Sequence, residues 1–169
     1  MLIDIKSVSR SREAFIEIDT EIGADVLSVS FQDYRLAGPV TFRGRLQADG
    51  DGVLGLTGRL TGAFDGICAR CLDSVHQSLD VAVDEIYRPE AALEGETESE
   101  SYRYEGHMVD LLPAIRDNLV LSLPPRVFCR QECRGLCPVC GTNLNEKDCG
   151  CRASEQESLS PFDQLKQLL

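Results

Sequence analysis

The sequence predicts an α+β protein. A predominantly antiparallel, curled β-sheet or barrel-like N-terminal part comes first, and a helix, a cysteine-rich segment and a short C-terminal helix follow. Three observations lead to this prediction: apolar and polar residues alternate through most of residues 1–88, an apolar helical pattern begins near residue 109, and five of the eight cysteines fall within residues 133–151. Alternation with a period of two is typical of a sheet with one buried and one wet face.

Length and charge limit the expected size of the folded domain and the kinds of partner it can bind. The chain has 169 residues, enough for a domain with a real core, and a formal net charge of −11. Binding of nucleic acid over the whole surface is not expected, because most of the surface would repel phosphate, and any such contact needs a local basic patch. The N-terminus lacks the apolar run of a signal peptide, and no stretch approaches the roughly 20 apolar residues of a membrane span. The expected location is the cytoplasm.

Four groups of alternating apolar residues predict the strands. The groups are Leu27, Val29 and Phe31; Val40, Phe42 and Leu46; Leu54, Leu56 and Leu60; and Leu79, Val81 and Val83. Turn-forming residues separate the groups at Gly38-Pro39, Asp49-Gly50-Asp51-Gly52 and Asp65-Gly66. The second of these turns joins two alternating runs and predicts a β-hairpin.

Four glycines lie inside the strand-like runs: Gly44, Gly55, Gly58 and Gly62. Glycine in a strand often marks a bulge or a sharp bend. These positions are the reason to expect a strongly curled sheet or a small barrel.

Two helices are expected in the second half of the chain. The first runs from about Val109 to Leu121, with Asp110 as its cap and with an apolar face made of Leu112, Ile115 and Leu119. Pro124-Pro125 ends this helix. The stretch Ser160-Pro161-Phe162-Asp163 predicts the start of a short terminal helix, because it offers a cap residue, a proline in the first turn and an acid near the positive end of the dipole.

The elements suggest a division of the chain into two parts. Residues 1–106 form a β-rich domain, which includes an acidic loop at residues 90–105 that is poor in apolar side chains. Residues 107–169 contain the first helix, the cysteine-rich segment and the terminal helix packed on it.

The cysteines lie in four close pairs: Cys68/Cys71, Cys129/Cys133, Cys137/Cys140 and Cys149/Cys151. Cytoplasmic thiols stay reduced, so such pairs indicate metal binding or catalysis rather than disulfides. The stretch Cys137-Pro138-Val139-Cys140-Gly141 has the form of a zinc knuckle, in which a tight turn brings two thiolates to one ion and glycine supplies a positive φ. Cys68-Ala69-Arg70-Cys71 has the same spacing, with Leu72 in place of the glycine. All-thiolate sites suit zinc, and an iron–sulfur cluster is the alternative, so the segment is predicted to be zinc-binding.

All eight cysteines are candidate metal ligands, and eight ligands make two four-cysteine sites. The last four lie within fifteen residues and can close a site locally, at a low cost in chain entropy. The first four would then form a non-local site that joins the β region to the segment after the helix. Two alternatives stay open: a zinc-ribbon pairing of Cys68/Cys71 with Cys137/Cys140, and a single site with spare cysteines.

Cationic residues gather near the cysteines: Arg70, Arg126, Arg130, Arg134, Lys147 and Arg152. They can neutralise the formal charge of about −2 that each four-thiolate zinc site would carry. They can also form the local basic patch that contact with RNA requires. Both interpretations stay open.

No feature of the sequence predicts an enzyme. A catalytic zinc keeps an open position and usually has histidine or carboxylate ligands, whereas all the candidate ligands here are cysteines. His76 and His107 have no recognisable partner in the sequence and are interpreted as surface or packing residues. We find no phosphate-binding glycine loop, nucleophile elbow or paired-carboxylate motif.

The cysteine motifs resemble those of a known family. The matching set is Cys68-Ala-Arg-Cys71, Leu123-Pro, Cys129-x3-Cys133-x-Gly135-Leu136-Cys137-Pro-x-Cys140-Gly141-x-Asn143-Leu144-Asn145 and Cys149-x-Cys151. This set resembles the YceD family, the large ribosomal RNA subunit accumulation proteins of bacteria and plastids, and the closing SPFDQLKQLL is similar to that family's terminal helix. The resemblance implies a role in accumulation, processing or assembly of 23S rRNA, without an established enzyme activity.

The function expected on this basis is a cytoplasmic, zinc-binding, non-enzymatic factor for biogenesis of the large ribosomal subunit. Its partner would be large-subunit pre-rRNA or a ribosomal or assembly protein, and the acidic net charge makes a basic protein partner plausible. No membrane or small-molecule substrate is expected. The alternatives are a zinc-stabilised interaction module in another complex, such as one that regulates transcription, and a thiol-based redox sensor.

Overall fold

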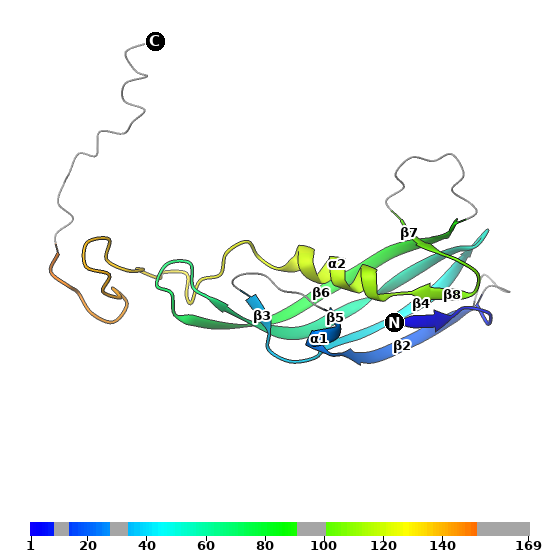
Figure 1. The fold of residues 1–169 in the computed structure, drawn as a ribbon, viewed down its shortest axis with the longest axis horizontal. Helices are drawn as coiled ribbons and strands as arrows, with labels where there is room; N and C mark the ends of the chain where they lie inside the picture. Colours follow the sequence, from blue (N-terminus) through cyan, green and yellow to red (C-terminus); the bar gives the residue numbers. More distant parts are fainter. Residues whose placement is uncertain (9–13, 28–33, 91–100, 152–169) are drawn as a thin grey trace, which may run out of the picture.

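The computed structural model describes residues 1–8, 14–27, 34–90 and 101–151. Its main feature is a long, twisted sheet with strands in the order β2-β4-β5-β6-β7, and β3 pairs with the C-terminal end of β5 (Figure 1). Every pair is antiparallel except β6–β7, which is parallel. The strands are β2 (Phe15–Ile22), β3 (Tyr34–Leu36), β4 (Val40–Gly50), β5 (Val53–Ile67), β6 (Ser74–Pro89) and β7 (Tyr102–Tyr104).

Four smaller elements accompany this sheet: β1 (Leu2–Asp4), β8 (Met108–Asp110), α1 (Ala24–Leu27) and α2 (Leu112–Ser122). β1 and β8 pair with each other as a separate antiparallel ribbon. The α+β, sheet-rich class is therefore confirmed, whereas the barrel-like alternative is wrong, because the described strands form an open sheet. The expected division at residue 106 falls between β7 and β8 and stays a prediction. Neither described helix has the length and apolar character needed to span a membrane.

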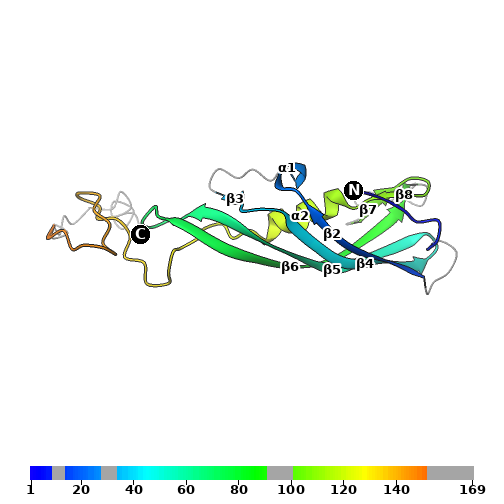
Figure 2. The ribbon, with the colours of Figure 1, turned by 90° about the horizontal axis from the view of Figure 1, so that it is seen from below.

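The predicted alternation buries one face of the sheet. The buried members are Val40, Phe42 and Leu46 in β4, Leu54, Leu56 and Leu60 in β5, and Leu79 and Val83 in β6. α2 lies along this face (Figure 2) and adds Ile115 and Leu119 to the core. Burial of each large aliphatic side chain contributes roughly 1.5–3 kcal/mol, so this face holds the fold together.

The predicted hairpin at Asp49-Gly50-Asp51-Gly52 is confirmed. β4 and β5 pair up to Gly50 and Val53, and the two residues between them have positive φ, +51° at Asp51 and +77° at Gly52. Two consecutive positive φ values define the tight turn whose twist matches that of the flanking strands. The hydroxyl of Tyr104 donates to the carbonyl oxygen of Gly52 (2.6 Å) and ties β7 to this turn.

The predicted turn at Asp65-Gly66 is wrong. β5 continues to Ile67, and the chain reverses instead within residues 68–73, which contain the first CxxC. Gly66 has a packing role, since a Cβ there would lie 2.9 Å from the ring of Tyr34, a residue of β3. That ring in turn packs edge-to-face on Phe64, with 5.4 Å between centroids.

Two of the strand glycines, Gly44 and Gly58, have a packing role rather than marking the predicted bulges. Gly44 and Gly58 face each other in an unbroken β4–β5 register, and the single irregularity of that pair lies between Ala48 and Gly50. A Cβ on Gly58 would lie 2.6 Å from the carbonyl oxygen of Arg43 and 2.8 Å from the ring of Phe42. The two glycines therefore make room for a buried aromatic ring.

Two further predicted element boundaries change. Leu27 ends α1 instead of starting a strand, because the N–H groups of Val26 and Leu27 bond back to Gly23 and close a helical turn. Val29 and Phe31 lie outside the described residues. The last part of the predicted acidic loop contains strand β7, which pairs with the C-terminal end of β6.

The predicted long helix starts three residues later than expected, because Val109 belongs to β8 and pairs with Ile3. The N-cap position is occupied by Leu111, although the Asp110 carboxylate still accepts a hydrogen bond from the Leu112 N–H (3.0 Å). The helix ends at Ser122, just before the two prolines, as expected. The predicted terminal helix at residues 160–169 lies outside the described residues.

Gly58→Ala is expected to lower the free energy of unfolding by about 1–3 kcal/mol, the usual cost of overpacking. Gly55→Ala in the same strand is the matched control, because a Cβ at Gly55 meets nothing within 4 Å. The control should leave stability unchanged or raise it by up to about 1 kcal/mol. Urea denaturation measures both variants, and equal stability of the two would contradict the packing role of Gly58.

Candidate metal centres

The first group of four cysteines joins the turn between β5 and β6 to the segment after α2. Val127 forms a parallel bridge with Cys68, and its carbonyl oxygen accepts a hydrogen bond from the Ala69 N–H (2.9 Å). These contacts bring the Sγ atoms of Cys68 and Cys133 to 3.8 Å and those of Cys71 and Cys129 to 3.5 Å. All four sulfur atoms of this first cluster lie within 4.8 Å of one another.

The second group lies beyond the first, at the end of the molecule farthest from the β4–β5 turn (Figure 1). Its sulfur atoms, those of Cys137, Cys140, Cys149 and Cys151, also lie within 4.8 Å of one another. The Gly141 N–H donates to the Cys137 carbonyl oxygen (2.9 Å), and Gly141 has a φ of +72°. Residues 137–141 thus form the predicted zinc-knuckle turn, and this turn carries Cys137 and Cys140 of the second cluster.

The grouping of the sulfur atoms follows the local partition expected from loop length. The described cysteines form two groups of four that could each hold a metal ion, and neither group combines Cys68/Cys71 with Cys137/Cys140. The zinc-ribbon pairing is therefore not the arrangement in this structure. The role of all eight residues as ligands stays a prediction.

The spacing of the sulfur atoms fits a tetrahedral metal site. A tetrahedron with metal–sulfur distances of about 2.3 Å has sulfur–sulfur edges of about 3.8 Å. The two measured contacts of the first cluster, 3.8 and 3.5 Å, are close to that edge. The donor set is sulfur alone, which suits zinc or iron–sulfur chemistry.

Local hydrogen bonds favour a thiolate in each cluster. Burial by itself raises the pKa of Cys68, but three backbone N–H groups outweigh it and lower this pKa to about 6. Hydrogen bonds from the side chain and backbone of Thr142 lower the pKa of Cys140 to about 6. Conversely, hydrogen bonds to Cys140 and Cys149 raise the pKa of Cys151 to about 12. Each cluster thus places a stabilised thiolate beside thiols whose protons a divalent cation can displace.

Leu72 occupies the position that glycine holds in the second knuckle. Its N–H donates to the Cys68 carbonyl oxygen (3.0 Å), and its φ is +65°. A non-glycine residue in this conformation costs roughly 1–2 kcal/mol. Because the Leu72 side chain is also 64% exposed, burial does not offset this strain.

The loop of the second cluster supports the first cluster through two asparagines. The Asn145 side chain donates to the Cys133 sulfur (3.3 Å) and accepts from the Arg134 N–H (2.8 Å). The Asn143 side chain donates to Asp73 (3.1 Å), whose carboxylate also accepts a hydrogen bond from Cys71 (3.1 Å). Sequence reasoning quoted these asparagines only as part of a motif, because their bonds form only in the folded loops, and Asp73 lies 70 residues from Asn143.

The nearby cations have different partners. Arg70 donates to the carbonyl oxygens of Gln131 (3.2 Å) and Cys133 (3.1 Å), and Arg134 forms an ion pair with Asp148. Among the described residues, the remaining cations form no ion pair: Arg126, Arg130 and Lys147. Arg152 lies outside the described residues.

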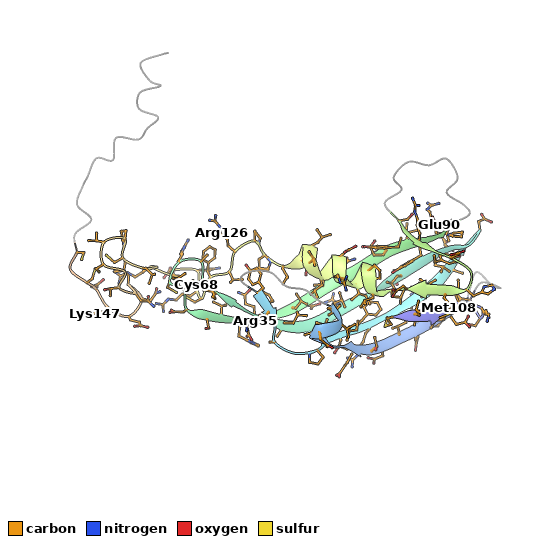
Figure 3. The ribbon with its side chains drawn as sticks, viewed as in Figure 1. Arg35, Cys68, Glu90, Met108, Arg126 and Lys147 are labelled. Carbon is orange, nitrogen blue, oxygen red and sulfur yellow. The ribbon has the colours of Figure 1, made fainter. Side chains whose placement is uncertain are left out.

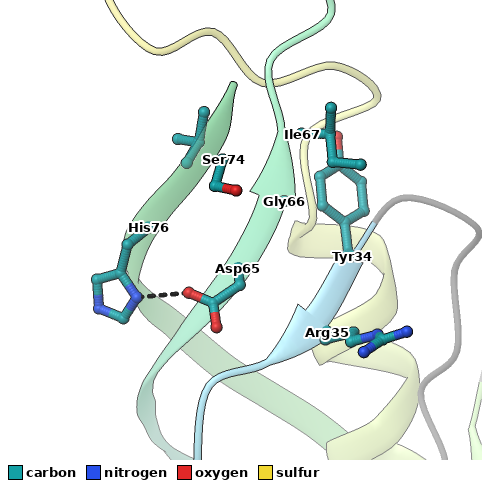
Figure 4. Close-up of a pocket in the computed structure, with 8 residues that line it drawn as sticks. Tyr34, Arg35, Asp65, Gly66, Ile67, Ser74 and His76 are labelled. Atoms are coloured by element: carbon teal, nitrogen blue, oxygen red, sulfur yellow. Dashed lines mark hydrogen bonds and ion pairs between the residues drawn. The ribbon is translucent and has the colours of Figure 1, made fainter. Parts of the chain in front are cut away.

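An open pocket of about 560 Å³ lies at the β3–β5–β6 end of the sheet, close to the first cluster (Figure 4). His76 has a partner that sequence reasoning missed, since its Nδ1 lies 2.7 Å from an Asp65 carboxylate oxygen in the adjacent strand. Ser74 also lines this pocket, but its side chain points away from the His76 ring in Figure 4. The pair is exposed and does not form a nucleophile–base–acid triad.

Comparison with known proteins establishes the family to which the chain belongs. The family described as "Large ribosomal RNA subunit accumulation protein YceD" matches residues 56–169, a range that contains all eight cysteines. The chain belongs to the YceD family. The resemblance found in the cysteine motifs is thereby confirmed.

Relatives of two kinds are similar to the chain. Uncharacterized proteins of Mycobacterium tuberculosis and Mycobacterium leprae are 32% and 28% identical over 155 residues, which is 85% of this chain and 70% and 67% of theirs. The chloroplastic YCED homolog 1 of Arabidopsis thaliana is 32% identical over 60 residues, which is 35% of this chain and 19% of that protein. Its Zea mays counterpart is 37% identical over 55 residues, which is 32% of this chain and 19% of that protein. No solved structure matches the chain.

Asn145→Ala is expected to weaken metal binding at the first cluster about 10- to 100-fold, the usual effect of losing an outer hydrogen bond to a ligand. Gln131→Ala is the matched control, because that residue contributes only its backbone carbonyl oxygen to the described contacts. Competition with a chromogenic chelator measures the affinity of each variant. Equal affinity in the two variants would contradict a supporting role for the asparagine.

Proposed function

We propose that this protein is a zinc-binding, non-enzymatic factor that supports 23S rRNA accumulation or processing and biogenesis of the large ribosomal subunit. The observation that carries the proposal is the family match over a range that includes both four-cysteine clusters. The names of the plant relatives refer to accumulation of large-subunit rRNA, and the same role is proposed for this chain.

Zinc is the proposed ion at both clusters, with all eight cysteines as ligands. The support is the all-sulfur donor set, the sulfur–sulfur spacing, and the hydrogen bonds that stabilise one thiolate in each cluster. When bound, zinc would cross-link the turn between β5 and β6 to the segment after α2. A structural zinc site contributes on the order of 10 kcal/mol to folding, so the cysteine segment would depend on it for its shape.

A non-enzymatic role agrees with the character of these sites. Four cysteines complete the coordination of zinc and leave no position for water or substrate. The described histidine with a carboxylate partner, His76, stands on an exposed sheet face without a nucleophile bonded to it. The proposed activity is therefore binding, in the cytoplasm, to pre-rRNA or to a ribosomal or assembly protein.

Depletion of the protein in the producing cell is expected to lower 23S rRNA relative to 16S rRNA and to reduce the large-subunit peak in a sucrose gradient. The wild-type chain should restore both, and Cys71→Ser should not, because the first cluster then loses a ligand. His76→Ala is the matched control and should restore both fully, since no catalytic role is assigned to His76. An immunoblot establishes that each variant is present at a comparable level.

Normal 23S rRNA and normal sedimentation after depletion would refute the ribosomal role. Failure of His76→Ala at a normal protein level would contradict the non-enzymatic part of the proposal.

A further inference from the structure

Phe128 is an exposed aromatic side chain held in place beside the first cluster. Its side chain is 37% exposed, although the neighbouring Val127 is buried. The Arg70 guanidinium lies over the Phe128 ring, 4.7 Å from its centroid. The hydrogen bonds from Arg70 to two backbone carbonyl oxygens fix the guanidinium. A ring that is fixed on one side and accessible to solvent is a surface on which a nucleic-acid base can stack.

Two arginines flank this ring in the sequence. Arg126 and Arg130 each lie two residues from Phe128, and both are exposed. Because Val127 is paired with Cys68 and buried, its neighbours Arg126 and Phe128 project from the opposite side of the chain. Neither arginine forms an ion pair within the described residues, so both guanidinium groups can meet phosphate.

The distribution of charge over the molecule favours residues 126–130, rather than the sheet face, as the place where phosphate would bind. Residues 123–131 contain two arginines and no acidic residue, in a chain of net charge −11. By contrast, Arg43 and Arg59 on the open sheet face are paired with Asp19 (3.1 Å) and Asp80 (2.7 Å). Figure 3 places Arg126 and Cys68 at one end of the molecule and Glu90 and Met108 at the other. An acidic surface repels phosphate, so a polyanion is directed toward the arginine-bearing end.

We propose that Arg70, Arg126, Phe128 and Arg130 form a binding platform for single-stranded RNA. One unpaired base stacks on Phe128, while Arg126 and Arg130 contact the phosphates on either side of it. A single strand is required, because the base of a duplex has no free face to stack. The inference rests on the proposed ribosomal function for the choice of RNA, and it makes this chain a direct RNA-binding protein.

The test is a titration of the full-length, zinc-loaded protein with a fluorescently labelled, unstructured 12-nucleotide RNA, followed by anisotropy. Phe128→Leu should weaken binding about 5- to 150-fold, the range for loss of one base-stacking contact. The double variant Arg126→Ala/Arg130→Ala should reduce the slope of log affinity against log salt by about 1.4, or about 0.7 for each lost phosphate contact. Duplex RNA of the same sequence should bind more weakly to the wild type.

Two control variants make the same kinds of substitution at exposed positions away from the platform. Phe15→Leu removes an exposed aromatic ring at the opposite end of the sheet, and Arg45→Ala removes an exposed arginine from the sheet face. Both should bind RNA as the wild type does. Zinc content and melting temperature, measured for every variant, separate loss of the platform from loss of the fold.

The platform is refuted if the wild type shows no RNA binding, or if Phe128→Leu and the arginine double variant, with normal zinc content, bind as tightly as the controls. This outcome is distinct from failure of the proposed function. A chain that does not bind RNA but whose depletion lowers 23S rRNA would act through a protein partner. A chain that binds RNA through the platform but whose depletion leaves 23S rRNA unchanged would retain the platform and lose the ribosomal role.

Discussion

The convergence of four cysteine sulfur atoms from two distant parts of the chain is the constraint on which the cysteine-rich end depends. Cys68 and Cys133 are 65 residues apart, and Cys71 and Cys129 are 58 apart. The backbone links between these parts, within the described residues, are the Cys68–Val127 bridge, the Ala69–Val127 hydrogen bond and the Leu136–Arg70 hydrogen bond. Side-chain hydrogen bonds from Arg70 and Asn143 add to them. The entropy of closing so long a loop opposes the arrangement, and mutual repulsion opposes ionisation of four adjacent thiols. A bound cation would remove the repulsion between the ionised thiols, and its binding free energy would offset the entropy lost on closing the loop.

The two clusters differ in what the sequence could predict of them. The second closes within fifteen residues around a recognisable knuckle, so spacing favoured this grouping of Cys137, Cys140, Cys149 and Cys151, although a zinc-ribbon pairing and a single site stayed open. The first was identified by elimination, and the supporting asparagines were missed, since their bonds to Asp73 and Cys133 exist only once both loops are folded. The same distinction holds in the sheet. The Asp51-Gly52 turn is encoded locally, whereas Gly66 makes room for a ring from β3, and His76 meets Asp65 only through strand register.

The two ends of the molecule differ in structure and in charge. One end and the middle form an open, acidic sheet with its core under α2, and the other end carries both clusters together with the aromatic and arginine side chains of residues 126–130. The fixed Arg70 links these features, because it bonds to the backbone around Cys133 and stacks on Phe128. Metal binding, by shaping this backbone, would therefore also shape the surface offered to a partner. This connection would couple the proposed structural metal sites to the proposed binding surface.

The most direct test of the account is the metal content of protein purified without chelators, combined with X-ray absorption at the zinc edge. The account predicts two zinc ions per chain, each with four sulfur neighbours at about 2.3 Å. Fully folded protein that contains neither zinc nor iron would contradict it, and so would a single zinc per chain or a coordination shell that includes nitrogen or oxygen.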